Sequence, residues 1–192
     1  MAPTSSDIDA FRGRDTVDFI MSTPPIGAPA PDFTLQSDRG DRFRLSDLRG
    51  RPVVLYFYPE DDTEGCTLEN IEFTDLLPQF VAEKVVVAGI SPDTVEKHCS
   101  FRDKHGLAVP LLADPDRKVI SAYGLWQLKK MFGVEFMGVK RATVIISPDG
   151  NVAELIHATR IKGHADRVLA AVRAHQAHGW VTPAAPRKSP RS

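Results

Sequence analysis

One stretch decides the fold: VVLYFYPEDDTEGCTL, at residues 53–68. Six apolar or aromatic residues in a row predict a buried β-strand over 53–58. The proline and the acidic residues after it predict a turn, and we expect a helix to begin near Thr67. Cys66 then lies at the first turn of that helix, where unpaired backbone N–H groups and the positive end of the helix dipole favour a thiolate. Because the thiolate is the nucleophilic form of cysteine, the stretch predicts thiol chemistry.

The other apolar runs predict a mixed β-sheet with helices on both faces, which is an α/β fold. Short strands at 33–36 and 43–45 form an N-terminal β-hairpin, and the run at 85–90 predicts a central parallel strand. Strands at 142–146 and 152–156 flank the SPDGN turn as a second hairpin. Four helices are expected: 67–80, interrupted by Pro78; one with its N-cap at Ser91, running to His105 and ended by Gly106; 116–123; and 163–178.

Composition limits the classes of function. The 192 residues carry a formal net charge of -1, from 24 basic and 25 acidic residues, which does not indicate a nucleic-acid partner. No apolar run approaches the roughly 18 residues of a membrane span, and the N-terminus lacks a secretory signal, so we expect a cytoplasmic protein with no membrane partner. We expect an N-terminal extension over 1–27, one folded domain over 28–182 and a disordered tail over 183–192.

The chain has two cysteines, Cys66 and Cys99, too few for a framework of structural disulfides. The third residue after Cys66 is Glu69, so the sequence lacks a CxxC pair at this point. Zinc-ribbon and thioredoxin-type redox sites therefore lose support.

Two motifs resemble those of the peroxiredoxins. Pro59, Thr63 and Cys66 match the active loop Pro-x-x-x-(Thr/Ser)-x-x-Cys of that family. A second run is similar to the Trp-x2-Lys-x3-Gly-x4-Gly-x2-Arg pattern of its bacterioferritin-comigratory or PrxQ group, and its matched residues are Trp126, Lys129, Gly133, Gly138 and Arg141. The opening APDF at 30–33 is also similar, and the resemblance covers about residues 28–178. It implies a thioredoxin-like fold and a peroxidase that acts in cell redox homeostasis.

The resemblance implies a role for each matched side chain. Cys66 would be the peroxidatic nucleophile, and the Thr63 hydroxyl would align the sulfur with the peroxide. Arg141 would stabilise the thiolate and the leaving oxygen, and Pro59 would shape the turn and shield the sulfur. Without the family motifs, Cys66 would be read as a small buried hydrophobe, Arg141 as half of a surface ion pair and Thr63 as a helix N-cap. No metal, haem or flavin cofactor is implied, since sulfur is the redox centre.

The active loop departs from the family in one respect. Glu64 stands where the family commonly has proline, and Glu60, Asp61 and Asp62 add three more carboxylates close to Cys66. Their negative field opposes the thiolate by an amount that depends on distance and screening, and it is small if they point into solvent.

The sulfenic acid formed on Cys66 must be condensed with a second thiol. Many PrxQ-like proteins carry this resolving cysteine five residues later, where this chain has Ile71; a minority carry it in the next helix, where Cys99 lies. The resemblance therefore implies a Cys66–Cys99 disulfide in a monomer or weak dimer, recycled by thioredoxin or a similar dithiol reductant. The alternatives are a one-cysteine peroxidase with an external thiol donor, and a redox sensor or holdase.

Overall fold

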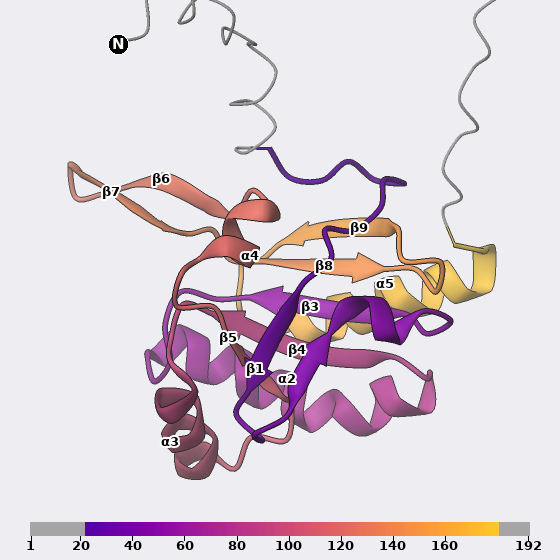
Figure 1. Cartoon of the computed structure of the whole chain (residues 1–192), viewed down its shortest axis with the longest axis horizontal. Helices are drawn as coiled ribbons and strands as arrows, with labels where there is room; N and C mark the ends of the chain where they lie inside the picture. The colour runs from indigo at the N-terminus through magenta and orange to yellow at the C-terminus, as the bar shows by residue number, and fades with distance from the viewer. Residues whose placement is uncertain (1–21, 181–192) are drawn as a thin grey trace, which may run out of the picture.

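The computed structural model describes residues 22–180, so most of the expected N-terminal extension and the whole expected tail lie outside the described residues. Its main sheet has seven strands in the order β2-β1-β5-β4-β3-β8-β9 (Figure 1). The strands are β1 (Thr34–Ser37), β2 (Arg42–Arg44), β3 (Val53–Phe57), β4 (Val86–Ser91), β5 (Leu111–Ala113), β8 (Ala142–Ile146) and β9 (Val152–His157). Because β4 is parallel to β3 and β5 while β8 is antiparallel to β3, the sheet is mixed, as the sequence predicts.

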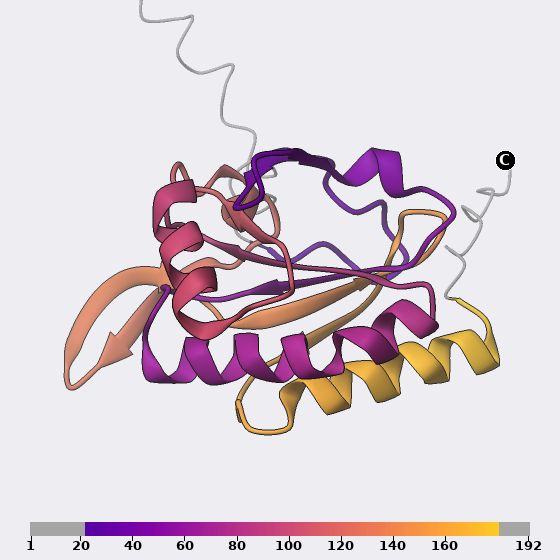
Figure 2. The ribbon, with the colours of Figure 1, turned by 90° about the horizontal axis from the view of Figure 1, so that it is seen from below.

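Every residue of β3 is buried, because the strand has a hydrophobic core on each face. Leu55 and Phe57 point into one core, while Val54 and Tyr56 point into the other. The helices are α2 (Glu64–Ala82), α3 (Val95–His105), α4 (Lys118–Ala122) and α5 (His164–His178), with a short 3₁₀ helix η2 (Leu45–Leu48). Figure 2 shows α2 and α5 side by side against one face of the sheet. Since α4 and η2 contribute side chains to the opposite core, helices lie on both faces, which confirms the predicted fold class.

Three features of the helices differ from the expected ones, and the first is that α2 begins at Glu64 and not near Thr67. Helix α2 continues through Pro78 to Ala82, so the predicted interruption at Pro78 is wrong. Burial of Phe80 in the core beyond the proline outweighs the lost backbone hydrogen bond. The N-cap of α3 is Thr94, whose hydroxyl accepts the Lys97 N–H at 3.3 Å, and not the predicted Ser91. Ser91 instead ends β4 in register with β5, whereas Gly106 ends α3 in the left-handed conformation, as predicted.

A hairpin between residues 126 and 139 has no counterpart among the expected elements. It comprises β6 (Trp126–Met131) and β7 (Val134–Val139), which form a separate two-stranded sheet. The hairpin projects from the body of the protein (Figure 1), and its tip residue Phe132 is 98% exposed. Its apolar side chains do not alternate toward a core, so the sequence pattern gave no strand signal here. Within residues 22–180, no helix combines the length and apolar character needed to cross a membrane.

The close contact between β4 and a buried tyrosine gives a test of this packing. A Cβ atom on Gly89 would lie 2.7 Å from Cζ of Tyr56, whose ring is stacked on Phe73 with centroids 4.2 Å apart. Because neither ring has room to move, we expect Gly89→Ala to lower the free energy of unfolding by about 2 kcal/mol in a urea titration. Gly138→Ala is the matched control, since its Cβ would meet the flexible Lys129 side chain first, at 3.0 Å. Equal losses in the two variants would contradict the packing.

Candidate active site

The turn from β3 to α2 positions Cys66. The strand ends at Phe57, and α2 begins at Glu64 with Thr63 at the N-cap, so Cys66 is the third residue of the helix. The side chain of Asn70 fixes this first turn, because its amide donates to the Cys66 carbonyl at 2.8 Å and accepts from the Tyr56 hydroxyl at 2.6 Å. The Cys66 side chain is buried. The sulfur therefore lies at a helix N-terminus, whose dipole favours its anionic form.

Strand pairing brings Arg141 to the same place. Arg141 directly precedes β8, and Ala142 stands opposite Phe57 at the end of β3. Its guanidinium Nη2 donates to Sγ of Cys66 at 3.0 Å. Burial alone would lower the pKa of Arg141, but the charges of Glu69 and Cys66 outweigh it and hold the pKa above its ordinary value. A permanent cation thus contacts a sulfur that lies 75 positions away in the sequence.

Glu69 is a site residue that the sequence reasoning missed. It follows Cys66 by three positions on α2, and its Oε2 accepts from Nη1 of Arg141, while its Oε1 has no hydrogen-bond partner. Burial raises the pKa of Glu69 to about 7, against the opposing charge of Arg141 and with a further contribution from Glu72. The i, i+3 spacing from Cys66 is a signal that could have identified it.

A buried histidine lies close to this carboxylate. His164 shares a 2.8 Å hydrogen bond with the Thr143 hydroxyl, and its Nε2 is 4.0 Å from Oε1 of Glu69. Burial, with the charges of Arg167 and Arg141, lowers the pKa of His164 to about 4. The imidazole is therefore neutral at pH 7, and Arg141 supplies the positive charge that contacts both Glu69 and the sulfur.

Thr63 and Pro59 both lie in the turn before the helix. The Thr63 hydroxyl donates to the Glu60 carbonyl at 3.2 Å and makes no N-cap bond to the helix. Pro59 lines a surface pocket of about 320 Å³ that also exposes Arg141. The other residues that line it are Lys129, Lys140, His157, Ala158 and Thr159. This pocket leads from the surface to the guanidinium that contacts the sulfur.

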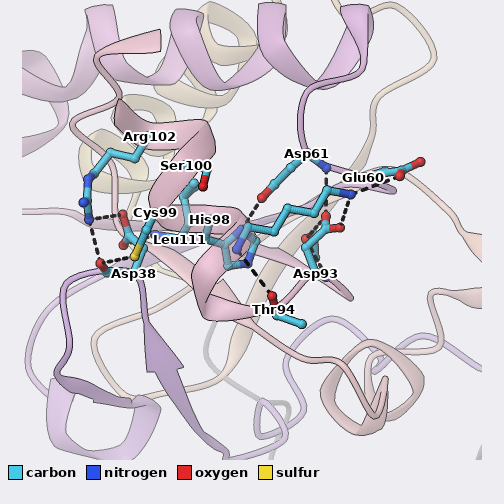
Figure 3. Close-up of polar contacts among 12 residues, drawn as sticks. Asp38, Glu60, Asp61, Asp93, Thr94, His98, Cys99, Ser100, Arg102 and Leu111 are labelled. Carbon is cyan, nitrogen blue, oxygen red and sulfur yellow. Dashed lines mark hydrogen bonds and ion pairs between the residues drawn. The ribbon is translucent and has the colours of Figure 1, made fainter. Parts of the chain in front are cut away.

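The carboxylates of the active loop are turned toward α3. Lys97 binds Glu60 at 3.0 Å, and Nδ1 of His98 lies 2.6 Å from Oδ2 of Asp61 (Figure 3). Asp62 is bound by Lys104 at 2.6 Å and by His105 at 2.8 Å, while Glu64 is exposed. Lysines therefore offset the charges of Glu60 and Asp62, water screens that of Glu64, and Asp61 is turned toward His98.

Cys99 lies on α3 and points to the turn between β1 and β2. Its thiol donates to the Asp38 carbonyl at 3.2 Å, in the turn between β1 and β2 (Figure 3). Both cysteines are free thiols in this structure. Among the described residues, no three His, Cys, Asp or Glu side chains form a group that could hold a metal ion.

The buried carboxyl of Glu69 predicts a pH dependence of stability. Its pKa is 4.5 in the unfolded chain and about 7 in the fold, so the folded state binds more protons between these values. Its contribution therefore falls as pH rises from 4.5 through 7, by on the order of 3 kcal/mol in total. We expect the unfolding free energy of Glu69→Gln, relative to wild type, to increase by that amount in urea titrations between pH 4.5 and 8.

Glu64→Gln, which removes an exposed carboxyl from the same helix, is the control for this experiment. Parallel curves for wild type and Glu69→Gln across this pH range would contradict a raised pKa at Glu69.

Comparison with known proteins identifies the family. Residues 26–155 match the AhpC/TSA family. Peroxiredoxin Bcp of Bacillus subtilis is 42% identical over 147 residues, which cover 77% of this chain and 94% of that protein. The structure of the bacterioferritin comigratory protein of Xanthomonas campestris superimposes with a TM-score of 0.74 at 35% identity, covering 79% of this chain and 99% of that one. PrxQ of Xylella fastidiosa gives a TM-score of 0.76 at 34% identity, covering 81% and 99%. The chain belongs to the AhpC/TSA family and, within it, to the Bcp/PrxQ peroxiredoxins.

Proposed function

We propose that this protein reduces hydrogen peroxide and organic hydroperoxides through the thiolate of Cys66. The observation that carries the proposal is the 3.0 Å contact between the Arg141 guanidinium and a sulfur in the first turn of α2. A helix N-terminus and a fixed cation both stabilise the thiolate without a metal or an organic cofactor. The related protein of Xanthomonas campestris is described as having alkyl peroxide reduction activity, which supports the inclusion of organic hydroperoxides.

In the first step, the thiolate attacks the terminal oxygen of the hydroperoxide and the O–O bond breaks. The products are a sulfenic acid on Cys66 and an alkoxide or hydroxide, which takes up a proton. Arg141 stabilises the charge that develops on the leaving oxygen. The peroxide would enter through the pocket beside Pro59, and the exposed Thr63 hydroxyl would turn from the Glu60 carbonyl to align it.

In the second step, Cys99 attacks the sulfenic sulfur, giving a Cys66–Cys99 disulfide and water. A thioredoxin-type dithiol then returns both cysteines to thiols. A disulfide needs Cα atoms about 4.4–6.8 Å apart, and Cys99 now donates to the Asp38 carbonyl, so α3 and the start of α2 must open locally. This cycle needs one protein chain, which is compatible with a monomer or weak dimer, and we place it in the reducing cytoplasm.

One observation favours a second mechanism. Because Cys99 is half-buried and donates to Asp38 in the β1–β2 turn, Cys66 could instead be resolved by an external thiol, as in a one-cysteine peroxidase. The two mechanisms share the first step and differ in the fate of the sulfenic acid. Catalytic turnover of peroxide distinguishes both from a redox sensor or a holdase.

The first test is peroxide consumption with thioredoxin, thioredoxin reductase and NADPH. We expect Cys66→Ser to abolish turnover and Arg141→Lys to lower the rate constant of Cys66 oxidation by about 100-fold, since lysine cannot donate to the sulfur and Glu69 together. Arg173→Lys is the matched control, because Arg173 binds Glu83 on the exposed surface. Full turnover by Cys66→Ser would refute the proposed function.

The second test concerns the fate of the sulfenic acid. After one equivalent of peroxide, mass spectrometry of the wild type should find a peptide that links Cys66 to Cys99. In Cys99→Ser the sulfenic acid should persist, and excess peroxide should convert it to sulfinic acid. A wild-type sulfenic acid that persists equally long would favour the one-cysteine mechanism.

A further inference from the structure

One completely buried contact between the active loop and α3 takes no part in the chemistry described above. Asp61, in the loop before Cys66, and His98, next to Cys99, are in contact through Oδ2 and Nδ1 at 2.6 Å (Figure 3). Both side chains are completely buried. A buried pair of titratable groups that contacts neither the sulfur nor Arg141 calls for a separate role.

Asp61 is held by two further hydrogen bonds. Its Oδ1 accepts the Tyr58 hydroxyl at 2.7 Å, and its backbone N–H donates to Oδ2 of Asp93 at 2.8 Å. His98 has no such support, because its Nε2 is buried without a hydrogen-bond partner. The Asp61 contact is thus the polar contact that holds the His98 ring.

The neighbouring residues attach α3 on another side. The Cys99 thiol donates to the Asp38 carbonyl, and Arg102 donates to the same carbonyl at 2.6 Å and to the Asp38 carboxylate at 3.0 Å. The helix is therefore fixed to the active loop through His98 and to the β1–β2 turn through Cys99 and Arg102. Cys99 cannot leave Asp38 for Cys66 unless this part of α3 moves.

The other contacts between α3 and the loop are more exposed. Lys97 and Glu60 are 41% and 60% exposed, Lys104 and Asp62 are 60% and 43% exposed, and His105, which also binds Asp62, is 21% exposed. Exposed ion pairs contribute little to stability, whereas breaking a buried hydrogen bond leaves polar groups without partners. Asp61–His98 is therefore the contact between α3 and the active loop in which both partners are completely buried. The core burial of Phe101 and the contacts of Cys99 and Arg102 with Asp38 also hold the helix.

We propose that His98 is a positioning residue for the resolving step, which holds α3 folded against Asp61 and so sets how fast Cys99 reaches Cys66. The inference rests on the proposed role of Cys99. Once the contact breaks, the Cys99 thiolate attacks the sulfur of the Cys66 sulfenic acid, the S–O bond breaks, and the leaving hydroxide takes up the thiol proton as water. The contact thus lengthens the life of the sulfenic acid without taking part in its formation.

The test measures the two steps separately in one protein. Wild type and His98→Leu are mixed with one equivalent of peroxide, quenched with an alkylating reagent at successive times and analysed by mass spectrometry. Sulfenic acid should form at the same rate in both, and the disulfide should form about tenfold faster in the variant, since unfolding rates rise when a native contact is removed. The variant should also accumulate less sulfinic acid in excess peroxide.

Two further comparisons separate the contact from general destabilisation. His98→Asn keeps an N–H near the position of Nδ1 and should restore the slow disulfide step, a result that a purely structural loss would not give. Asp61→Asn should accelerate the step, while Asp62→Asn, the same change at the next residue, should alter it less than about twofold because the Asp62 side chain is 43% exposed. This second pair of variants also serves if His98→Leu does not fold.

Each outcome bears on a different claim. Equal disulfide rates in wild type, His98→Leu and Asp61→Asn would overturn the positioning role and leave the peroxidase function intact. Absence of the disulfide in the wild type would overturn both the role of Cys99 and that of His98. Failure of Cys66 to form a sulfenic acid at all would instead refute the proposed function.

Discussion

The contact between Arg141 and Cys66 depends on the antiparallel pairing of β3 with β8. That register sets Ala142 opposite Phe57, so the residue before β8 lies beside the loop that follows β3. The same loop starts α2, which places the sulfur at the positive end of a long helix. The dipole of α2, which follows β3, and the guanidinium of Arg141, which precedes β8, therefore both place positive potential at the buried sulfur.

A carboxyl group with no direct part in the proposed reaction, that of Glu69, also contacts Arg141. Glu69 binds the opposite edge of the guanidinium, and its burial raises its pKa to about 7. When Glu69 is ionised, it orients Arg141 and shares its charge; when protonated, it leaves more of that charge for the sulfur. The pKa of the nearby His164 is lowered to about 4, so its imidazole is neutral at pH 7. Of these two groups, Glu69 is the one whose protonation changes around neutral pH.

The acidic residues of the active loop bind side chains of α3. From the sequence alone, Glu60, Asp61 and Asp62 are expected to destabilise the thiolate. In the fold they bind Lys97, His98 and Lys104. The carboxyl groups that were expected to repel the thiolate therefore hold α3, the helix that carries Cys99. The contacts that turn these carboxylates toward α3 therefore also hold that helix in place.

The sequence by itself determined the buried strand, the position of Cys66 in the first turn of a helix and the mixed sheet, because apolar runs and turn residues act locally. It did not predict the hairpin at 126–139, whose exposed side chains lack a core to alternate toward, or the continuation of α2 past Pro78. Only the tertiary structure decided that Glu69 binds Arg141, that the loop acids face α3 and that Cys99 faces Asp38. These contacts join residues that are far apart in the chain, and the sequence does not show which face of a helix meets which neighbour. Their geometry is fixed by the packing of whole helices and strands.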